Sequence, residues 1–292
     1  GEVRSCDIAE FDVGMKLIDD TGNTVPYVTL SRQEGLSVTQ EIAFHAEVPA
    51  AGFRTYYIVP GENPVDAVKT CEICLDSDID YDPAQKLTYS TVRQVQKGPR
   101  RSQGLNTYEN DFFKLTVDTI TGALTVYDKS SGELLFDKLE IVGVEERRGN
   151  YISDMKPSGR TFPALIDSIE TIDNNAVWCR IRISGSVYSM PFSQVVTLYR
   201  NAPEISLENE IDWQEPRWVR LEQLFTYAGE DVNISYGVPF GYVKYPETLS
   251  GAATQEWDEI SDEERNKLRL CRHWVDIGGN TSGATIAADH RM

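Results

Sequence analysis

Apolar and polar residues alternate with a period of two along much of this chain, and β-branched and aromatic residues fill the apolar positions. This period places successive side chains on opposite faces of an extended strand, so it predicts β-strands that turn one face to a core. The clearest runs lie at 114–117, 124–127, 178–183, 194–199 and 204–212. In the last run the acidic residues share one face, while the apolar residues and Asn209 share the other.

Turn-forming residues separate these runs at short intervals. Asp, Asn, Gly, Ser and Pro gather at 20–23, 130–132, 173–175 and 201–203, and each of these residue types favours a turn. Many short strands joined by such turns are typical of a β-sandwich. One helix is predicted at 261–270, where Ser261 can cap the first turn and Glu264 occupies the capping-box position.

The segment 61–104 differs in character and predicts a junction between two domains. It contains three prolines, a Cys-x-x-Cys pair and a basic cluster. Residues 1–60 are then expected to form a small β-domain with a strand at 43–49, and residues 105–292 a large β-sandwich domain. Because the chain starts at Gly1 and stops soon after an apolar run, we expect a piece of a longer protein, with the large domain truncated at its C-terminus.

Composition excludes several kinds of partner. The chain has 292 residues, 40% of them hydrophobic, which is enough for a real core, and a net charge of -18. Because a polyanionic surface repels phosphates, we expect neither nucleic acid nor an anionic membrane as a partner, whereas a neutral sugar is unaffected. No segment approaches the roughly 20 apolar residues of a membrane helix, and no signal pattern opens the chain. Five cysteines imply no disulfide framework, so the expected location is the cytoplasm.

Motifs for metal binding and catalysis are weak or missing. The Cys-x-x-Cys pair at 71–74 has no second pair to complete a zinc site. The alternating aspartates at 76–82 are similar to the start of a calcium loop but lack the Gly and Glu that an EF-hand needs. No serine hydrolase elbow, phosphate loop or dinucleotide fingerprint is present. Packing or pairing is the expected role of the three histidines, which are His45, His273 and His290.

Carboxylates and aromatic residues leave a carbohydrate ligand open. A glycosidase needs two carboxylates that converge on one bond, which a linear sequence cannot show. An aromatic ring can contact a sugar, but in a β-sandwich most aromatic residues belong to the core. The aromatic candidates for sugar contact are Tyr151, Tyr236, Phe240, Tyr242, Trp257 and Trp274.

Short motifs follow one another along the chain in a fixed order. Residues 108–113 read YENDFF and residues 121–124 read TGAL. Later motifs are GNY at 149–151, ENEIDW at 208–213, RL and LF within 220–225, VPFG at 238–241 and HWVD at 273–276. This series resembles the large β-domain of the α-mannosidases of glycoside hydrolase family 38, and residues 17–26 and 48–53 resemble the small β-domain before it.

The resemblance implies a small β-sandwich domain followed by a large galactose-mutarotase-like β-supersandwich. It also implies that the parent protein is a zinc-dependent retaining α-mannosidase with a covalent glycosyl-enzyme intermediate. In that family the zinc, its ligands and the nucleophile belong to an N-terminal barrel, which is missing from this sequence. The expected partners are an α-mannoside or related glycan and the N-terminal catalytic barrel of the same polypeptide, and this chain alone is expected to be inactive.

Two residues are candidates for substrate contact through the resemblance. Tyr151 matches a family tyrosine that reaches the sugar, and its alternative role is that of an ordinary strand-end tyrosine. A family arginine that also faces the substrate has no match, and near its place this chain has Lys244, which offers a point charge instead of a fork of donors. Two other functions stay open, namely an independent carbohydrate-binding or assembly module without catalysis, and a β-domain that only supports the barrel.

Overall fold

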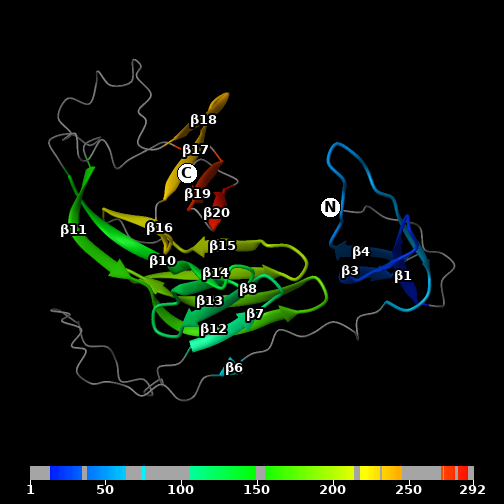
Figure 1. Cartoon of the computed structure of the whole chain (residues 1–292). Coiled ribbons are helices and arrows are strands. Elements are labelled where there is room, and N and C mark those ends of the chain that lie inside the picture. The colour runs from blue at the N-terminus through cyan, green and yellow to red at the C-terminus, as the bar shows by residue number, and fades with distance from the viewer. Residues whose placement is uncertain are drawn as a thin grey trace. The chain divides into compact units, whose positions relative to one another are not determined.

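The computed structural model describes residues 14–34, 38–63, 74–75, 105–148, 155–213, 218–230, 232–244, 271, 273–279 and 282–288. Every regular element among these residues is a β-strand, which confirms the all-β prediction for that part of the chain (Figure 1). None of the described residues belongs to a helix that could cross a membrane. The predicted helix at 261–270 lies outside the described residues.

The described part of the chain contains twenty strands. In chain order they are β1 (Met15–Asp19), β2 (Thr24–Val25), β3 (Tyr27–Glu34), β4 (Val38–Phe44), β5 (Tyr56–Pro60), β6 (Cys74–Leu75), β7 (Leu105–Glu109), β8 (Phe113–Asp118), β9 (Leu124–Asp128), β10 (Glu133–Arg148), β11 (Met155–Pro163), β12 (Leu165–Asn174), β13 (Trp178–Val187), β14 (Met190–Tyr199), β15 (Ile205–Ile211), β16 (Val219–Tyr227), β17 (Asn233–Val238), β18 (Gly241–Lys244), β19 (Trp274–Gly278) and β20 (Gly283–Ala287).

The chain divides into two compact units. Residues 1–123 and 140–223 form the first unit, and residues 124–139 and 224–292 form the second. The boundary predicted at 61–104 concerns a different division, between a small and a large β-domain, and it stays a prediction.

Residues 14–63 of the first unit form two small antiparallel sheets. Their strand orders are β2-β1-β5 and β3-β4. The buried side chains of Leu17, Tyr27 and Ile42 pack together as a local core. This segment therefore has a hydrophobic core contributed by both small sheets.

The strand predicted at 43–49 is wrong in its extent, because β4 ends at Phe44. After β4, the side chain of Tyr56 forms hydrogen bonds with the backbone of Glu47. The N–H of Glu47 donates to the Tyr56 hydroxyl at 2.8 Å, and that hydroxyl donates to the Glu47 carbonyl oxygen at 3.1 Å. His45 accordingly lies after the strand instead of within it.

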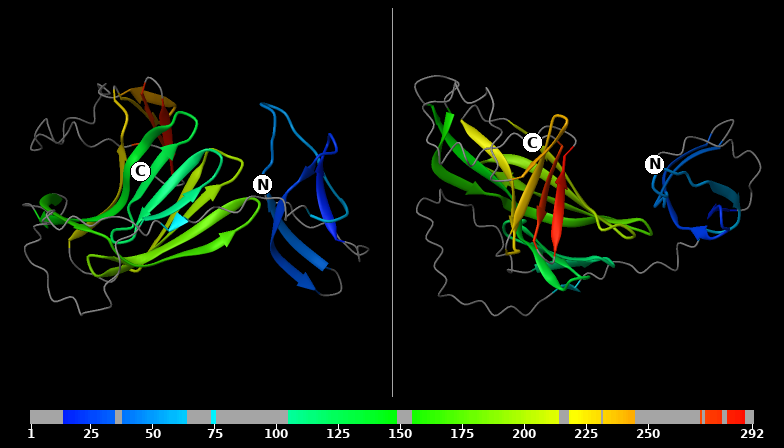
Figure 2. Two further views of the ribbon diagram at one scale, coloured as in Figure 1. Left: turned by 60° about the horizontal axis from the view of Figure 1, so that its bottom comes forward. Right: turned by 45° about the horizontal axis from the view of Figure 1, so that its top comes forward.

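A four-stranded antiparallel sheet holds much of the core of the first unit. Its strand order is β12-β13-β14-β15, so each strand pairs with its neighbours in sequence. Strand β13 alternates between buried and half-buried positions along its whole length, which is the period-two pattern predicted for 178–183. Ile181 and Val196 lie opposite each other in neighbouring strands and are fully buried. Figure 2 shows that the strands of this sheet are long and twisted.

The turn that follows β8 is closed by backbone hydrogen bonds. The N–H of Asp118 donates to the Ala123 carbonyl at 2.9 Å, and the N–H of Gly122 donates to the Asp118 carbonyl at 2.9 Å. Gly122 has a φ of 69°, which favours glycine. Thr121 and Gly122 therefore lie in the turn between β8 and β9.

A second four-stranded antiparallel sheet belongs to the second unit, with the order β18-β17-β19-β20. One of its faces is apolar and packs Tyr236, Val243 and Cys271 into a small core, with Val238 and Val275 at its margin. Alternation places the intervening residues on the opposite face. We call this opposite face the outer face, and it carries the candidate site.

Candidate functional site

A row of four polar residues crosses the outer face, one from each strand of the sheet. Ser235 of β17 lies opposite both Lys244 of β18 and Asp276 of β19, and Asp276 lies opposite Thr285 of β20. Residues directly opposite one another in antiparallel strands point to the same face. We call Lys244, Ser235, Asp276 and Thr285 the polar row, and neighbouring members are separated by about 4.8 Å, the spacing of strands.

The chemistry of the polar row is varied. The Lys244 ammonium can donate three hydrogen bonds, whereas the Asp276 carboxylate can only accept. The Thr285 hydroxyl donates to the Asp276 carboxylate at 2.8 Å, which fixes one carboxylate oxygen. Lys244 and Thr285 are exposed, and Ser235 and Asp276 are half-buried. The row thus presents both donors and acceptors to a ligand.

Two aromatic side chains lie beside the polar row on the same face. Tyr242 and Trp274 each come two residues before a member of the row, so they point to the same side of the sheet. Their ring centroids are 6.4 Å apart and their planes are inclined by 43°. Gly237, which lies opposite Tyr242 in the middle strand, has no side chain to fill the space at this level.

The turn between β17 and β18 displays a further aromatic residue. Pro239 and Phe240 form the turn, and Phe240 is fully exposed with a φ of 70°. A positive φ costs a non-glycine residue about 1–2 kcal/mol. This hairpin therefore holds a large apolar side chain in solvent in a backbone conformation that would suit glycine.

The aromatic candidates for sugar contact differ in how exposed they are. Tyr236 is 5% exposed and belongs to the core on the apolar face. It is therefore a core residue and not a candidate for sugar contact. Tyr242 and Phe240 are exposed, whereas Trp274 is half-buried. Tyr151 and Trp257 lie outside the described residues.

The residues considered for metal binding are not brought together in the described part of the chain. No group of three or more His, Cys, Asp or Glu side chains there could hold a metal ion. His273 is exposed at the start of β19, and its carbonyl accepts a hydrogen bond from the Ala288 N–H at 2.8 Å. The aspartates at 76–82 and His290 lie outside the described residues.

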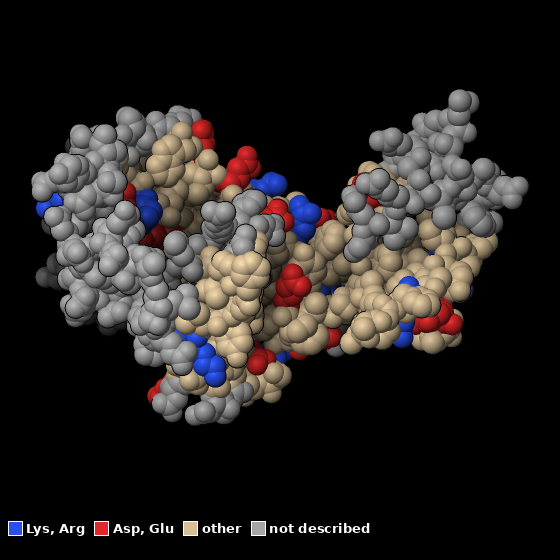
Figure 3. All heavy atoms as spheres, turned by 90° about the horizontal axis from the view of Figure 1, so that it is seen from above, with Lys and Arg blue, Asp and Glu red and all other residues tan. Residues whose placement is uncertain are grey.

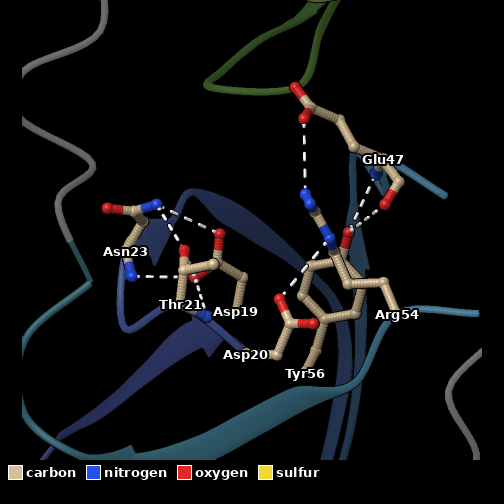
Figure 4. Close-up of polar contacts among 7 residues, drawn as sticks. All are labelled: Asp19, Asp20, Thr21, Asn23, Glu47, Arg54 and Tyr56. Carbon is tan, nitrogen blue, oxygen red and sulfur yellow. Dashed lines mark hydrogen bonds and ion pairs between the residues drawn. The ribbon is translucent and has the colours of Figure 1, made fainter. Parts of the chain in front are cut away.

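A compact group of polar residues in the first unit has a structural role. The Asp19 carboxylate closes the turn after β1 by accepting hydrogen bonds from the Thr21 hydroxyl at 2.7 Å, the Thr21 N–H at 3.0 Å and the Asn23 N–H at 2.8 Å (Figure 4). These hydrogen bonds lower the pKa of Asp19 to about 2, and the bond from the Thr21 hydroxyl has the largest effect. The bonds all serve the turn itself.

Next to this turn, Arg54 pairs with two carboxylates. Its guanidinium lies 3.5 Å from Asp20 and 3.4 Å from Glu47 (Figure 4). The pair with Asp20 connects the loop before β5 with the turn after β1, and the pair with Glu47 lies within that loop. Both carboxylates are exposed, so the contribution of these pairs to stability is small.

Charge gathers into no large patch on the face of the molecule seen in Figure 3. The acidic and basic side chains of the described residues occur there in small, mixed groups. Charge therefore does not mark a site on that face, although the net charge of the chain is -18.

Lys244 is a candidate from the sequence, but its neighbours Ser235, Asp276 and Thr285 are evident only from the strand pairing. Trp274 and Asp276 stood within a motif whose spacing of two is a signal for one face of a strand. Only the register of four strands shows that this pair lies level with Lys244 and Thr285.

Comparisons with known proteins point to one family. Residues 108–292 match the model of the family described as "Glycosyl hydrolases family 38 C-terminal domain". No curated protein has a significantly similar sequence.

Two crystal structures have a similar fold. One is of a protein in glycosyl hydrolase family 38 from Enterococcus faecalis, with 15% sequence identity and a TM-score of 0.57. The other is of an alpha-mannosidase from Enterococcus faecalis V583, with 14% identity and a TM-score of 0.56. The similarity covers 96% and 95% of this chain but 33% and 32% of those proteins. The chain thus spans about a third of the length of these structural relatives.

Proposed function

Since the chain belongs to the family of glycosyl hydrolase family 38 C-terminal domains, we propose that it is the C-terminal β-region of a zinc-dependent retaining α-mannosidase. The observation that carries this proposal is the family match over residues 108–292. The same substrate class is supported by the alpha-mannosidase from Enterococcus faecalis V583. This chain shares the fold of about a third of that protein. An α-mannoside and an N-terminal catalytic barrel are the proposed partners.

The chemical steps belong to the barrel in this proposal. The zinc and the nucleophile belong to the barrel, as the family resemblance implies, and no reaction step is assigned to this chain. Zinc bound there would hold sugar hydroxyls. The role of this chain is to support the barrel and to form a wall of the active site.

Tyr151 and Lys244 are the proposed contacts between this wall and the substrate. A tyrosine hydroxyl can donate to a sugar oxygen while its ring packs on the sugar. The exposed ammonium of Lys244 can donate to hydroxyl oxygens. Both residues would bind the substrate without taking part in bond cleavage.

A second candidate function is a carbohydrate-binding module that acts without catalysis. The specific observation in its favour is the outer face, where the polar row lies beside Tyr242 and Trp274. Both functions place a glycan against this chain. They differ in whether the longer polypeptide cleaves it.

Turnover of an aryl α-mannoside separates the two functions. We expect turnover from the longer polypeptide that contains the barrel, supplied with zinc, and none from the 292-residue chain. Replacing Lys244 by Met or Tyr151 by Phe should lower kcat/KM roughly tenfold, which is the effect of losing one hydrogen bond to the substrate. Exposed Lys138 of β10 provides the control, since Lys138→Met should leave kcat/KM unchanged. Failure of the longer polypeptide to act on any α-mannoside would contradict the enzyme proposal.

A further inference from the structure

We propose that the outer face of the β18-β17-β19-β20 sheet binds one pyranose unit of a neutral glycan. In this site the rings of Tyr242 and Trp274 pack on the sugar ring, and the polar row binds its hydroxyl groups. The site would work in the 292-residue chain without the barrel. The inference rests on the proposed function only for the choice of mannose as the test sugar.

The aromatic pair supplies the apolar half of this site. Tyr242 is 60% exposed although it lies within a strand, so its ring is available to a ligand. The 43° inclination between its plane and that of Trp274 makes a shallow V instead of a closed stack. Aromatic rings prefer apolar contact on their faces while a polar end stays in water. The C–H face of a pyranose ring matches this requirement.

The polar row supplies the hydrogen bonds. Asp276 is held in place by the Thr285 hydroxyl and is half-buried, so its carboxylate is fixed before a ligand arrives. Hydrogen bonds from hydroxyl groups to a carboxylate are stronger than those between neutral groups. Lys244, two strands away across Ser235, donates from the other end of the row. A ligand with several hydroxyl groups can satisfy both ends together.

The charges of the row favour a neutral ligand. Lys244 carries one positive charge and Asp276 one negative charge, so the row has no net charge. The whole chain carries -18, which disfavours an anion such as a phosphate or a sialylated sugar. A neutral sugar is attracted by hydrogen bonds and is not repelled by the field of the protein.

Glycines leave the sheet open beside the row. Gly278 follows Asp276 by two residues and therefore lies on the outer face, where a Cβ atom added to it would meet no atom within 4 Å. Gly283 lies opposite Gly278 in β20. These positions form a floor without side chains next to the Asp276 carboxylate, which gives a sugar hydroxyl room to approach.

Ligand-observed NMR of the 292-residue chain with methyl α-D-mannopyranoside tests the site. Saturation-transfer signals of the sugar should appear with the unchanged chain and disappear with Tyr242→Ala. Asp276→Asn removes the charge but keeps the shape of the side chain. The apparent affinity of this variant for the sugar should be roughly tenfold lower. Tyr57→Ala, which removes an exposed tyrosine of β5, is the matched control and should bind as the unchanged chain does. Circular dichroism melts show whether each variant is folded. Because Tyr242 is exposed, we expect Tyr242→Ala to fold normally.

The result that overturns the inference is absence of sugar signals up to the solubility limit, or equal binding by all the variants. Activity of the longer polypeptide on an aryl α-mannoside is measured separately. If that polypeptide is active and the chain does not bind the sugar, the inference fails while the proposed function stands. If the chain binds the sugar and the polypeptide is inactive, the enzyme proposal fails while the site stands. If Asp276→Asn lowers the Tm of the longer polypeptide but does not change sugar binding, the face packs against protein and the inference is overturned.

Discussion

The carboxylate of Asp19 shows how one residue can close a turn. Hydrogen bonds from Thr21 and Asn23, the largest effect coming from the Thr21 hydroxyl, hold the pKa of Asp19 at about 2, below the ordinary value of 3.8. The ionised form is therefore favoured by folding, and its stabilising contribution is fully present above pH 3.8 and is lost as the pH falls through 2. We expect Asp19→Ala to lower the Tm at pH 7, with a difference from the unchanged chain that shrinks steadily between pH 4 and pH 2.

Thermal unfolding followed by circular dichroism at pH 7, 4 and 2 measures this dependence. Asp20→Ala is the control, because Asp20 is the neighbouring carboxylate and makes only an exposed ion pair with Arg54. The same Tm difference for Asp19→Ala at pH 7 and pH 2 would contradict the assigned role of the ionised carboxylate.

Arg200 gives a second prediction at the scale of a single residue. Its side chain is 9% exposed, and its Nε donates to the Asn175 carbonyl at 2.6 Å while a terminal nitrogen donates to the Asn174 amide oxygen. Lysine cannot reach two acceptors with fixed, separate donors. We expect Arg200→Lys to lower the free energy of unfolding in urea by about 1.5–3 kcal/mol, the value of hydrogen bonds to a charged group.

The control for this change is Arg182→Lys. Arg182 pairs with Glu170 at 2.7 Å, but both side chains are exposed, so the exchange should cost less than about 0.5 kcal/mol. Equal losses of unfolding free energy for the two exchanges would mean that the burial of Arg200 does not increase the stability that its hydrogen bonds provide.

At the scale of elements, alternation predicted the strands of the first unit well. The runs at 178–183 and 194–199 became parts of β13 and β14, and the run at 204–212 became β15. In β13 and β14 the apolar residues of one face are buried, so burial and sequence carry the same signal there. In β15 the apolar residues are only half-buried. The strand predicted at 43–49 failed because Tyr56, from a different strand, satisfies the backbone of Glu47. Contacts of that kind depend on tertiary structure and leave no local pattern.

The glycines of two turns allow a test of turn chemistry. Gly122 and Gly132 both have a positive φ, of 69° and 73°. A Cβ atom on Gly122 would lie 2.6 Å from Ile166 Cδ1, whereas a Cβ atom on Gly132 would meet nothing within 4 Å. We expect Gly132→Ala to cost about 1–2 kcal/mol for the backbone alone. Gly122→Ala should cost more, because a displaced core side chain adds about 1–3 kcal/mol.

Urea unfolding of the two alanine variants measures both costs. The difference between them isolates the clash with Ile166, since the backbone cost is common to both turns. Equal destabilisation would show that the Ile166 side chain moves aside freely and that packing around the turn is loose.

At the scale of the whole molecule, the sequence offers Lys244 and the aromatic residues as candidates but does not show that they share one face of a sheet. Strands β18 and β19 are separated in sequence by residues 245–273. Their registers with β17 are set by long-range pairing, which no short window of sequence contains. Sequence motifs therefore predicted the family, while the arrangement of Asp276 and Thr285 beside Lys244 had to come from the fold.

Removal of residues 1–104 tests the predicted domain boundary. Strands β1 to β5 pair only among themselves in the sheets of the described residues, and residues 14–63 have a local core. We therefore expect a shortened chain of residues 105–292 to keep its cooperative unfolding, since among the described pairings it loses only the two-residue strand β6 from its sheets. It should also bind methyl α-D-mannopyranoside as the whole chain does, because every residue of the outer face lies within it. A chain of residues 124–292 is the control, and it should fail to fold because it lacks β7 and also β8, which holds the fully buried Leu115 and Val117. Circular dichroism melts and sugar NMR measure both properties, and loss of the unfolding transition in residues 105–292 would place the boundary elsewhere.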